Sequence, residues 1–343
     1  MVPALRLSHP RACRLSSEAV NPSEALGLPS LQEGLERLEP LLTASVVTGD
    51  SFLDDVTTHL IAAGGKRLRP LLALASATGG AREATQEDLL GGVAVELVHL
   101  ASLYHDDVLD EATIRRNVES VNSRFGNLVA IVAGDYLLAR SAAIAAGLGT
   151  DIARLLAETL GRLCQGQVSE VRSAFQITRG RDDYTAAIAG KTAALMSTSC
   201  RIGSLTGGLP AAEVEACTEY GRCFGMVFQI RDDILDITST EGELLKPAGQ
   251  DLAEGIYNLP TLVALEDPDC GPDLRALLGK PLDQPEREKA CAIVAGSTGI
   301  AASVTEARRY VERAQSATAG LAVTDLRNGL SRLVAELLTD LPD

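Results

Sequence analysis

Two short acidic segments with the same spacing constrain this chain more than any other feature. Residues 106–110 read DDVLD and residues 232–236 read DDILD, so each segment carries aspartates at its first, second and fifth positions. Each segment lies within a long stretch of helical apolar periodicity, and on a helix residues i and i+4 share a face. Like charges at that spacing repel each other by roughly 0.2–0.5 kcal/mol per pair. The pattern therefore predicts two helices that share a cation, and carboxylate oxygens suit Mg²⁺.

The rest of the chain indicates an all-α protein. It has 343 residues, of which 46% are hydrophobic and only 3% aromatic, and its Ala- and Leu-rich segments favour helices. Residues 85–88 resemble a capping box that opens the helix with the first acidic segment. We expect further helices near residues 29–47, 51–63, 71–78, 128–147, 151–175, 183–206, 211–237, 258–268, 284–296, 301–319 and 323–340. No β-hairpin signal stands out. We predict a disordered extension over residues 1–28 and one helical domain over 29–343.

Charge and cysteine content exclude several classes of protein. The net charge of −15 argues against a nucleic-acid partner, whose binding surface would be basic. The seven cysteines are odd in number and form no CxxC pair, which favours reduced thiols in a cytoplasmic protein over disulfides or a zinc site. The most apolar segment, residues 128–148, is interrupted by Asp135 and Arg140. We interpret it as a core helix and expect no transmembrane segment.

A basic segment precedes the first acidic one. Residues 65–70 read GKRLRP, which places three cations between a glycine and a proline. Glycine lets a ligand approach the backbone closely, and lysine and arginine bind phosphate oxygens. Taken alone, the segment fits a solvated basic turn equally well. Together with two metal-binding acidic segments, it indicates a site where a metal cluster holds a diphosphate and neutralises it as it leaves.

On these segments the chain resembles the trans-isoprenyl diphosphate synthases, or polyprenyl synthetases. The matching segments keep the order and spacing of that family between about residues 60 and 261: GGKRLRP (64–70), DDVLDEATIRR (106–116), GDYLLAR (134–140), KT (191–192), FQIRDDILD (228–236) and KPAGQDL (246–252). The resemblance implies a helical bundle around a central cavity and a Mg²⁺-dependent prenyltransferase. It also implies a homodimer, and isopentenyl diphosphate and an allylic diphosphate as substrates.

The resemblance further assigns roles to individual residues. The Mg²⁺ ligands would be Asp106, Asp107, Asp110, Asp232, Asp233 and Asp236. Arg115, Lys191 and Lys246 would bind the allylic diphosphate, whereas Lys66, Arg69, His99 and Arg116 would bind isopentenyl diphosphate. Thr192 and Gln229 would stand beside the allylic end, where their dipoles stabilise a carbocation. The protein would then act through positioning and electrostatics, without a covalent nucleophile.

Three positions depart from the family pattern. Asn117 and Glu119 replace the glycine and proline that commonly follow the arginine pair, and Glu119 adds negative charge near a diphosphate site. Leu245 replaces a glycine that commonly precedes Lys246. Ile256 replaces a lysine in the segment before Pro260, so one phosphate-binding cation is lost. We expect this loss to weaken binding without abolishing it.

Small residues on the helix before the first acidic segment predict a long product. Ala94, Val98 and Ser102 recur every four residues up to Asp106, and Ala101 flanks this stripe. A helical turn rises ~5.4 Å, close to the length of one isoprene unit. In the resembling family, an aromatic residue four or five positions before the motif is typical of short-chain enzymes. We therefore expect a product longer than C15, with a medium or long chain favoured over geranylgeranyl diphosphate.

Three other functions remain open at the level of sequence. A class I terpene synthase ionises the same substrate group, but it needs no second diphosphate site or basic segment at Lys66. A noncatalytic subunit of a two-component synthase would not need both acidic segments intact. His105-Asp106 matches the HD pair of metal phosphohydrolases, but that site needs more histidines than His9, His59 and His99 offer. For a prenyl synthase we also expect peripheral membrane contact when the product is released.

Overall fold

The computed structural model describes residues 22–238 and 248–342. Lys246 and Leu245 lie outside the described residues. The first half of the chain forms α1 (Pro22–Leu26), α2 (Pro29–Ala44), α3 (Ser51–Ala62), α4 (Leu68–Thr78), α5 (Gln86–Leu109), β1 (Ile114–Arg115), β2 (Val118–Glu119), α6 (Val121–Phe125), α7 (Asn127–Leu148) and α8 (Thr150–Ser173). The second half forms α9 (Arg181–Ile188), the π-helical turn η1 (Ala189–Ala193), α10 (Ala194–Thr206), α11 (Ala211–Thr238), α12 (Gln250–Ala253), α13 (Leu259–Glu266), α14 (Gly271–Leu277), α15 (Gln284–Gly296), α16 (Gly299–Thr318) and α17 (Thr324–Glu336).

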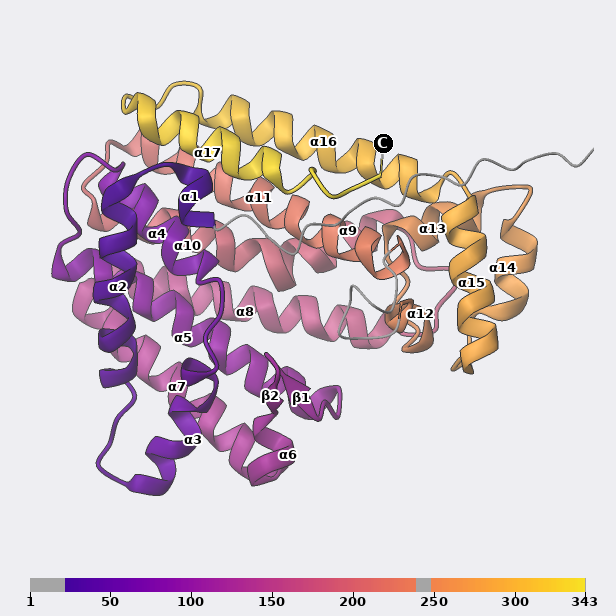
Figure 1. Cartoon of the computed structure of the whole chain (residues 1–343), viewed down its shortest axis with the longest axis horizontal. Helices are drawn as coiled ribbons and strands as arrows, with labels where there is room; N and C mark the ends of the chain where they lie inside the picture. Colours follow the sequence, from indigo (N-terminus) through magenta and orange to yellow (C-terminus); the bar gives the residue numbers. More distant parts are fainter. Residues whose placement is uncertain (1–21, 239–247, 343) are drawn as a thin grey trace, which may run out of the picture.

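The all-α prediction is confirmed, and the long helices lie close to their expected positions. In Figure 1, α8, α11 and α16 run along the long axis of the molecule, and α14 and α15 form one of its ends. The predicted capping box opens α5: the Thr85 hydroxyl accepts from the Asp88 amide at 3.3 Å, and the Asp88 carboxylate accepts from the Thr85 amide at 2.8 Å. The segment predicted as one helix over 183–206 is interrupted by the π-helical turn η1.

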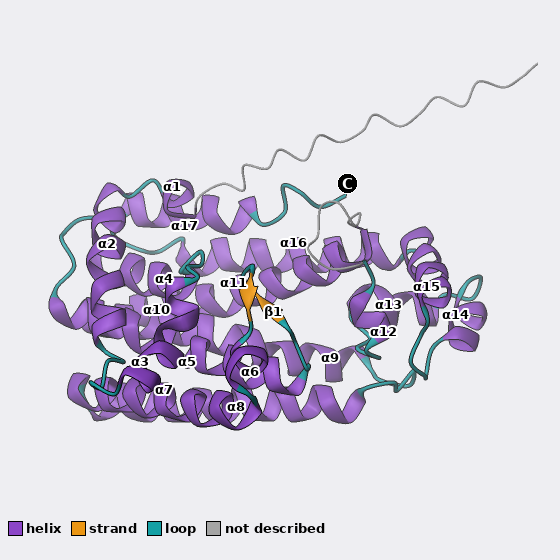
Figure 2. Cartoon of the chain, turned by 60° about the horizontal axis from the view of Figure 1, so that its bottom comes forward, coloured by secondary structure: helices purple, strands orange, loops and turns teal. Residues whose placement is uncertain are grey.

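The expectation that the chain has no β-hairpin is wrong. Strands β1 and β2 pair in an antiparallel hairpin soon after the end of α5 (Figure 2). The two residues of its turn, Arg116 and Asn117, both have left-handed backbone conformations, with φ of 53° and 63°. Such turns require positive φ at both central positions, and asparagine adopts this conformation readily. Asn117 therefore suits this turn without a glycine.

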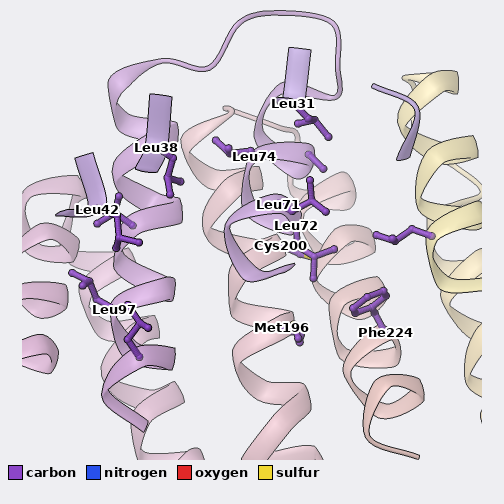
Figure 3. Packing of buried hydrophobic residues seen from close by; sticks show 14 of the residues in the cluster. Leu31, Leu38, Leu42, Leu71, Leu72, Leu74, Leu97, Met196, Cys200 and Phe224 are labelled. Carbon is purple, nitrogen blue, oxygen red and sulfur yellow. The ribbon is translucent and has the colours of Figure 1, made fainter. Parts of the chain in front are cut away.

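The main hydrophobic core joins the helices of the first half to α10 and α11. In Figure 3, Leu38 and Leu42 of α2 lie on the side of Leu97 of α5, and Leu71 and Leu72 of α4 lie beside Cys200 of α10, with Phe224 of α11 beyond. Helices α4 and α10 approach each other closely because α10 carries glycines at the contact. A Cβ atom on Gly203 would lie 1.9 Å from the carbonyl oxygen of Ala73. Through α10, which packs on both, this core joins α5 and α11, the two helices that carry the acidic segments.

The N-terminal end of the described chain belongs to the packed structure. Helix α1 packs against α17, and Leu26 and Leu28 are buried in the main core. Ordered structure thus includes residues 22–28, which we expected within the extension. Residues 1–21 lie outside the described part of the chain.

Helix α7 is the segment that we interpreted as a core helix. Within the described residues, it alone is long and apolar enough to cross a membrane, unless α15 and α16 are taken as one span with a bend of 62°. One side of α7 packs extensively against α5. The opposite side is solvent-exposed and apolar: Leu128, Ile131 and Val132 are 76%, 41% and 55% exposed.

Candidate active site

The first acidic segment ends α5, and its three aspartates differ in environment. Asp106 is half-buried, Asp110 is exposed, and Asp107 is completely buried. Asp107 Oδ1 accepts from Arg115 Nε at 2.7 Å and lies 2.6 Å from Arg115 Nη2, so Arg115 of β1 is tied to the end of α5. Burial raises the pKa of Asp106, and Lys191 opposes that shift while Asp110 adds to it. Asp106 and Asp110, which are four residues apart, thus place their carboxylates on the side of α5 that faces Lys191.

The second acidic segment lies near the end of α11. Asp232 is exposed, whereas Asp233 is buried and both of its carboxylate oxygens accept hydrogen bonds. Tyr184 of α9 donates to Oδ2, and Gln229 Nε2 donates to Oδ1 at 2.9 Å. Asp232 pairs with Arg231 at 3.3 Å, and desolvation raises the pKa of the buried Asp233 to about 7. The second segment therefore holds negative charge at a free-energy cost that an added cation would offset.

Asp251 of α12 is a further acidic residue that the sequence analysis did not single out. Burial, followed by the charges of Asp236 and Asp233, raises its pKa well above the ordinary value. Asn258 Nδ2 donates to Asp251 Oδ2 at 3.3 Å and contacts the backbone oxygen of Asp233 at 3.4 Å. The only signal in the sequence was its place in KPAGQDL. Asp251 thus places one more carboxylate next to the second acidic segment.

The ion pair of Lys191 and Glu170 affects the charge of both acidic segments. Lys191 Nζ is 2.6 Å from Glu170 Oε1, and the pKa of Lys191 is raised because Glu170 and Asp106 outweigh the opposing effect of burial. The charge of Glu170 also contributes to the raised pKa of both Asp106 and Asp233. The sequence analysis named Lys191 but missed Glu170, which has no neighbouring motif to mark it.

The π-helical turn determines where Lys191 and Thr192 lie. Such turns are rare and occur frequently at functional sites, because the extra residue redirects the side chains that follow. Here η1 packs directly on α8: a Cβ atom on Gly166 would lie 2.6 Å from the amide nitrogen of Lys191. Gly166 thus allows the approach of the two elements. Thr192 Oγ1 donates to Gln229 Oε1 at 2.7 Å, which links η1 to α11.

Of the residues predicted to bind isopentenyl diphosphate, Arg69, His99 and Arg116 interact electrostatically with one another, whereas Lys66 acts on Asp232 of the second acidic segment. Lys66 is exposed, while Arg69, His99 and Arg116 are half-buried. Burial lowers the pKa of Arg69 to about 10, and Arg116 adds to this shift. Burial and the same arginines lower the pKa of His99 well below its usual value, so this imidazole is neutral at pH 7. The cluster is rich in positive charge, as a site for a diphosphate requires.

Arg67, the middle cation of the basic segment, forms buried ion pairs that the sequence analysis did not predict. Its buried guanidinium lies 2.6 Å from Glu39 and 2.9 Å from Glu96. Glu96 also lies 4.0 Å from Arg116, which donates to the carbonyl oxygens of residues 60 and 64. A Cβ atom on Gly65 would lie 2.9 Å from Arg116 Cζ, so glycine is needed where the hairpin turn meets the basic segment.

The structure describes the surroundings of two of the three departures from the family pattern. Asn117 occupies the hairpin turn, and the exposed carboxylate of Glu119 accepts a hydrogen bond from the Ser123 hydroxyl at 2.8 Å on α6. Ile256 is half-buried and supplies no charge. A different cation lies next to that segment: Arg179 is buried and donates to the carbonyl oxygen of Tyr257 at 3.3 Å.

The small residues before the first acidic segment divide between two environments. Ala94 and Val98 are buried in a cluster between α5, α7, α8 and α10, together with Ile152, Leu156, Leu195 and Ile202. Ala101 is buried in the main core, and the half-buried Ser102 donates to the backbone oxygen of His99 at 2.8 Å. Ala94, Val98 and Ala101 therefore lie among apolar side chains.

His105 joins two helices. It lies 3.1 Å from the carbonyl oxygen of Ile131 and 3.5 Å from the carboxylate of Asp135, both on α7. A Cβ atom on Gly134 would lie 2.3 Å from the His105 ring, so the glycine of GDYLLAR allows this contact. In the described residues, no group of three or more His, Cys, Asp or Glu side chains forms a ready metal centre. These contacts place His105 at a helix–helix junction.

Comparison with known proteins identifies the family. A profile of the polyprenyl synthetase family matches residues 50–294. The chain belongs to the polyprenyl synthetase family. This polyprenyl synthetase is 36% identical over 318 residues to nonaprenyl diphosphate synthase of Mycobacterium tuberculosis, a match that covers 92% of this chain and 95% of that protein. The resemblance inferred from the sequence motifs is confirmed.

Solved structures agree with this assignment. The decaprenyl diphosphate synthase of Rhodobacter capsulatus superposes with a TM-score of 0.86 at 29% identity, covering 93% of this synthetase and 99% of that chain. The polyprenyl synthase of Caulobacter crescentus, complexed with calcium and isoprenyl diphosphate, gives a TM-score of 0.86 at 27% identity, covering 93% and 98%. The all-α fold and the enzyme class, a transferase of prenyl groups, follow from these matches.

Proposed function

We propose that this synthetase condenses isopentenyl diphosphate with an allylic diphosphate to make a trans-polyprenyl diphosphate longer than C15, in a Mg²⁺-dependent reaction. The observation that carries the proposal is the arrangement of charge. The acidic segments of α5 and α11 both interact with the Lys191–Glu170 pair, and the basic cluster of Lys66, Arg69 and Arg116 lies beside them. Two diphosphates and a cation cluster require such alternating charge.

The donor set fits Mg²⁺. Asp106, Asp110, Asp232 and Asp236 are the proposed direct ligands, since hard oxygen donors at i and i+4 can share an ion. Burial raises the pKa of Asp106 against the opposing charge of Lys191, and a divalent cation would offset the cost of holding this carboxylate ionised. When bound, Mg²⁺ would supply Lewis-acid stabilisation of the leaving diphosphate. We assign Asp107 and Asp233 a positioning role, because Arg115, Tyr184 and Gln229 bond to their carboxylates.

The chain's own residues would bind and orient the two substrates. Arg115 and Lys191, with Lys246 outside the described residues, would bind the allylic diphosphate, and Lys66, Arg69, His99 and Arg116 would bind isopentenyl diphosphate. As the allylic C–O bond breaks, its electrons leave with the diphosphate, and Thr192 and Gln229 face the cation that remains. The isopentenyl double bond attacks this cation, and the departed diphosphate takes the proton that is lost. The barrier falls through orientation and fixed dipoles.

Product length is proposed to depend on the apolar cluster between α5, α7, α8 and α10. Ala94 and Val98 contribute small side chains to this cluster, and no aromatic residue lies one turn before the first acidic segment. Two of the three relatives named above are nonaprenyl and decaprenyl diphosphate synthases by name. These observations support a medium or long product over geranylgeranyl diphosphate.

A homodimer is proposed from the exposed face of α7. Leu128, Ile131 and Val132 form an apolar surface that costs free energy in water, and such a surface fits a second copy of the chain. Size-exclusion chromatography with light scattering would test this assembly; a monomer at micromolar concentration would refute it. We also propose a cytoplasmic enzyme with peripheral membrane contact, because its product has one polar end and a long apolar chain.

One assay tests the central proposal. The purified chain is incubated alone with Mg²⁺, isopentenyl diphosphate and farnesyl or geranylgeranyl diphosphate, and the products are resolved by reversed-phase chromatography. We expect prenyl diphosphates longer than C15. A C20 product alone would identify a geranylgeranyl diphosphate synthase, and a hydrocarbon formed without isopentenyl diphosphate would identify a terpene synthase. Absence of any product from every primer would refute the proposal and favour a subunit that needs a partner.

A further inference from the structure

A chain of four side chains lies behind the second acidic segment. Tyr184, which is 3% exposed, donates its hydroxyl hydrogen to Asp233 Oδ2. Gln229 Nε2 donates to Asp233 Oδ1 at 2.9 Å, and Thr192 Oγ1 donates to Gln229 Oε1 at 2.7 Å. The four residues come from α9, the adjoining turn η1, and α11, which follows after α10. The chain of hydrogen bonds therefore joins the π-helical turn to the second acidic segment.

The hydrogen bonds determine the direction of every dipole in this chain. Both carboxylate oxygens of Asp233 accept hydrogen bonds, and the NH₂ end of the Gln229 amide faces one of them. The oxygen end of the amide must then face Thr192. Because the Thr192 hydroxyl donates its single hydrogen to that oxygen, the remaining surface of the threonine oxygen carries only lone pairs. Lone pairs stabilise an adjacent carbocation, whereas an outward O–H or N–H would destabilise it.

Further contacts hold Asp233 and Tyr184 in place. The guanidinium of Arg179 lies 5.7 Å from the centre of the Tyr184 ring, and it is itself buried and bonded to the carbonyl oxygen of Tyr257. Asn258 Nδ2 contacts the backbone oxygen of Asp233 at 3.4 Å. Tyr184 thus has little freedom to turn away from the carboxylate. No other described side chain donates to Asp233 Oδ2.

We propose that Tyr184 and Asp233 are positioning residues that orient Gln229 and Thr192 so that oxygen lone pairs face the allylic carbocation. This inference rests on the proposed function, in which such a cation forms. Tyr184 and Asp233 act through Gln229 and do not bind the diphosphates. They therefore affect the rate of ionisation more than the affinity for either substrate.

The first test removes one hydrogen-bond donor. Tyr184→Phe keeps the aromatic ring beside Arg179 and loses only the hydroxyl that fixes Asp233. At saturating Mg²⁺ we expect kcat to fall about tenfold, with the KM values for both diphosphates and the Mg²⁺ concentration for half-maximal activity unchanged within about twofold. The matched control is Tyr220→Phe, which also removes a buried hydroxyl, one that donates to the carbonyl oxygen of Leu330 at 2.9 Å. The control should keep the wild-type kcat with a similar change in melting temperature.

The second test reverses the dipoles without losing hydrogen bonds. In Asp233→Asn, the new amide can accept from Tyr184 while its NH₂ faces Gln229, which must then turn its oxygen inward and its NH₂ toward Thr192. We expect kcat to fall about 100-fold while melting temperature changes by only a few degrees. A purely structural role predicts the opposite pattern, in which kcat follows stability.

The outcomes separate this inference from the proposed function. An inactive wild-type enzyme would refute the proposed function itself. An active wild type with unchanged kcat in both variants, or with raised KM and unchanged kcat, would overturn the positioning role alone. If Tyr184→Phe does not fold, the kcat of Asp233→Asn decides between these outcomes.

Discussion

The two acidic segments have nearly the same sequence but different partners. In the first, the buried Asp107 is paired with a cation, Arg115, which comes from the hairpin after α5. In the second, the buried Asp233 accepts hydrogen bonds from two neutral donors, Tyr184 and Gln229. The middle aspartate therefore contacts an arginine in one segment and neutral dipoles in the other. Under the proposed function, residues at equivalent places in the two motifs would act on different parts of the same reaction.

The largest effects should come from the outer aspartates, where the two segments are equivalent. Asp106→Ala and Asp232→Ala each remove a proposed Mg²⁺ ligand, so we expect at least about a 100-fold loss of kcat/KM in both, measured with radiolabelled isopentenyl diphosphate. Asp151→Ala is the control, because this carboxylate is exposed at the start of α8. An active Asp232→Ala enzyme would mean that the segments do not share metal ions.

The middle aspartates should separate the segments. Asp107→Asn weakens the buried ion pair with Arg115, which lies at 2.6 Å, and breaking such pairs costs roughly 3 kcal/mol. We expect this variant to raise the KM for the allylic diphosphate about tenfold with a smaller change in kcat, because Arg115 is displaced from the substrate. Asp233→Asn should show the reverse pattern. Steady-state kinetics of the two variants side by side would refute the contrast if both changed the same parameter.

The sequence pointed to candidate residues but not to the contacts between them. The aspartates, Lys191, Thr192 and Gln229 were proposed because their spacing repeats a family pattern. Tyr184, Glu170, Glu96 and Asp251 were missed because each acts across helices distant in sequence, and Tyr184 and Asp233 are 49 residues apart. The hairpin was missed because two-residue strands carry no alternation, and its turn depends on the left-handed backbone of Arg116 as well as of Asn117.

The residues one turn before each segment also differ, and this difference should control product length. Ser102 precedes Asp106 by four positions, whereas Phe228 precedes Asp232 by four. Only the helix of the first segment thus presents a small side chain. Ser102→Phe should shorten the main product, measured by chromatography, because a ring would narrow the space one turn from the metals. Ala101→Phe should also shorten it, but at a cost of roughly 1–3 kcal/mol, since Ala101 is fully buried. Unchanged length in both variants would refute the stripe model.

The smallest effect should come from Glu170, whose charge affects both segments. Glu170 binds Lys191 at 2.6 Å and so competes with the allylic diphosphate for this lysine. The pair is partly exposed, and such ion pairs contribute at most about 1 kcal/mol, which corresponds to roughly a fivefold change in affinity. Glu170→Gln should therefore lower the KM for the allylic diphosphate by up to about fivefold, with Glu158→Gln on the exposed face of α8 as the control. An increase in KM would mean that Glu170 supports the bound substrate and metals. The two acidic segments would then be coupled through the ligands that they share, and not through competition for Lys191.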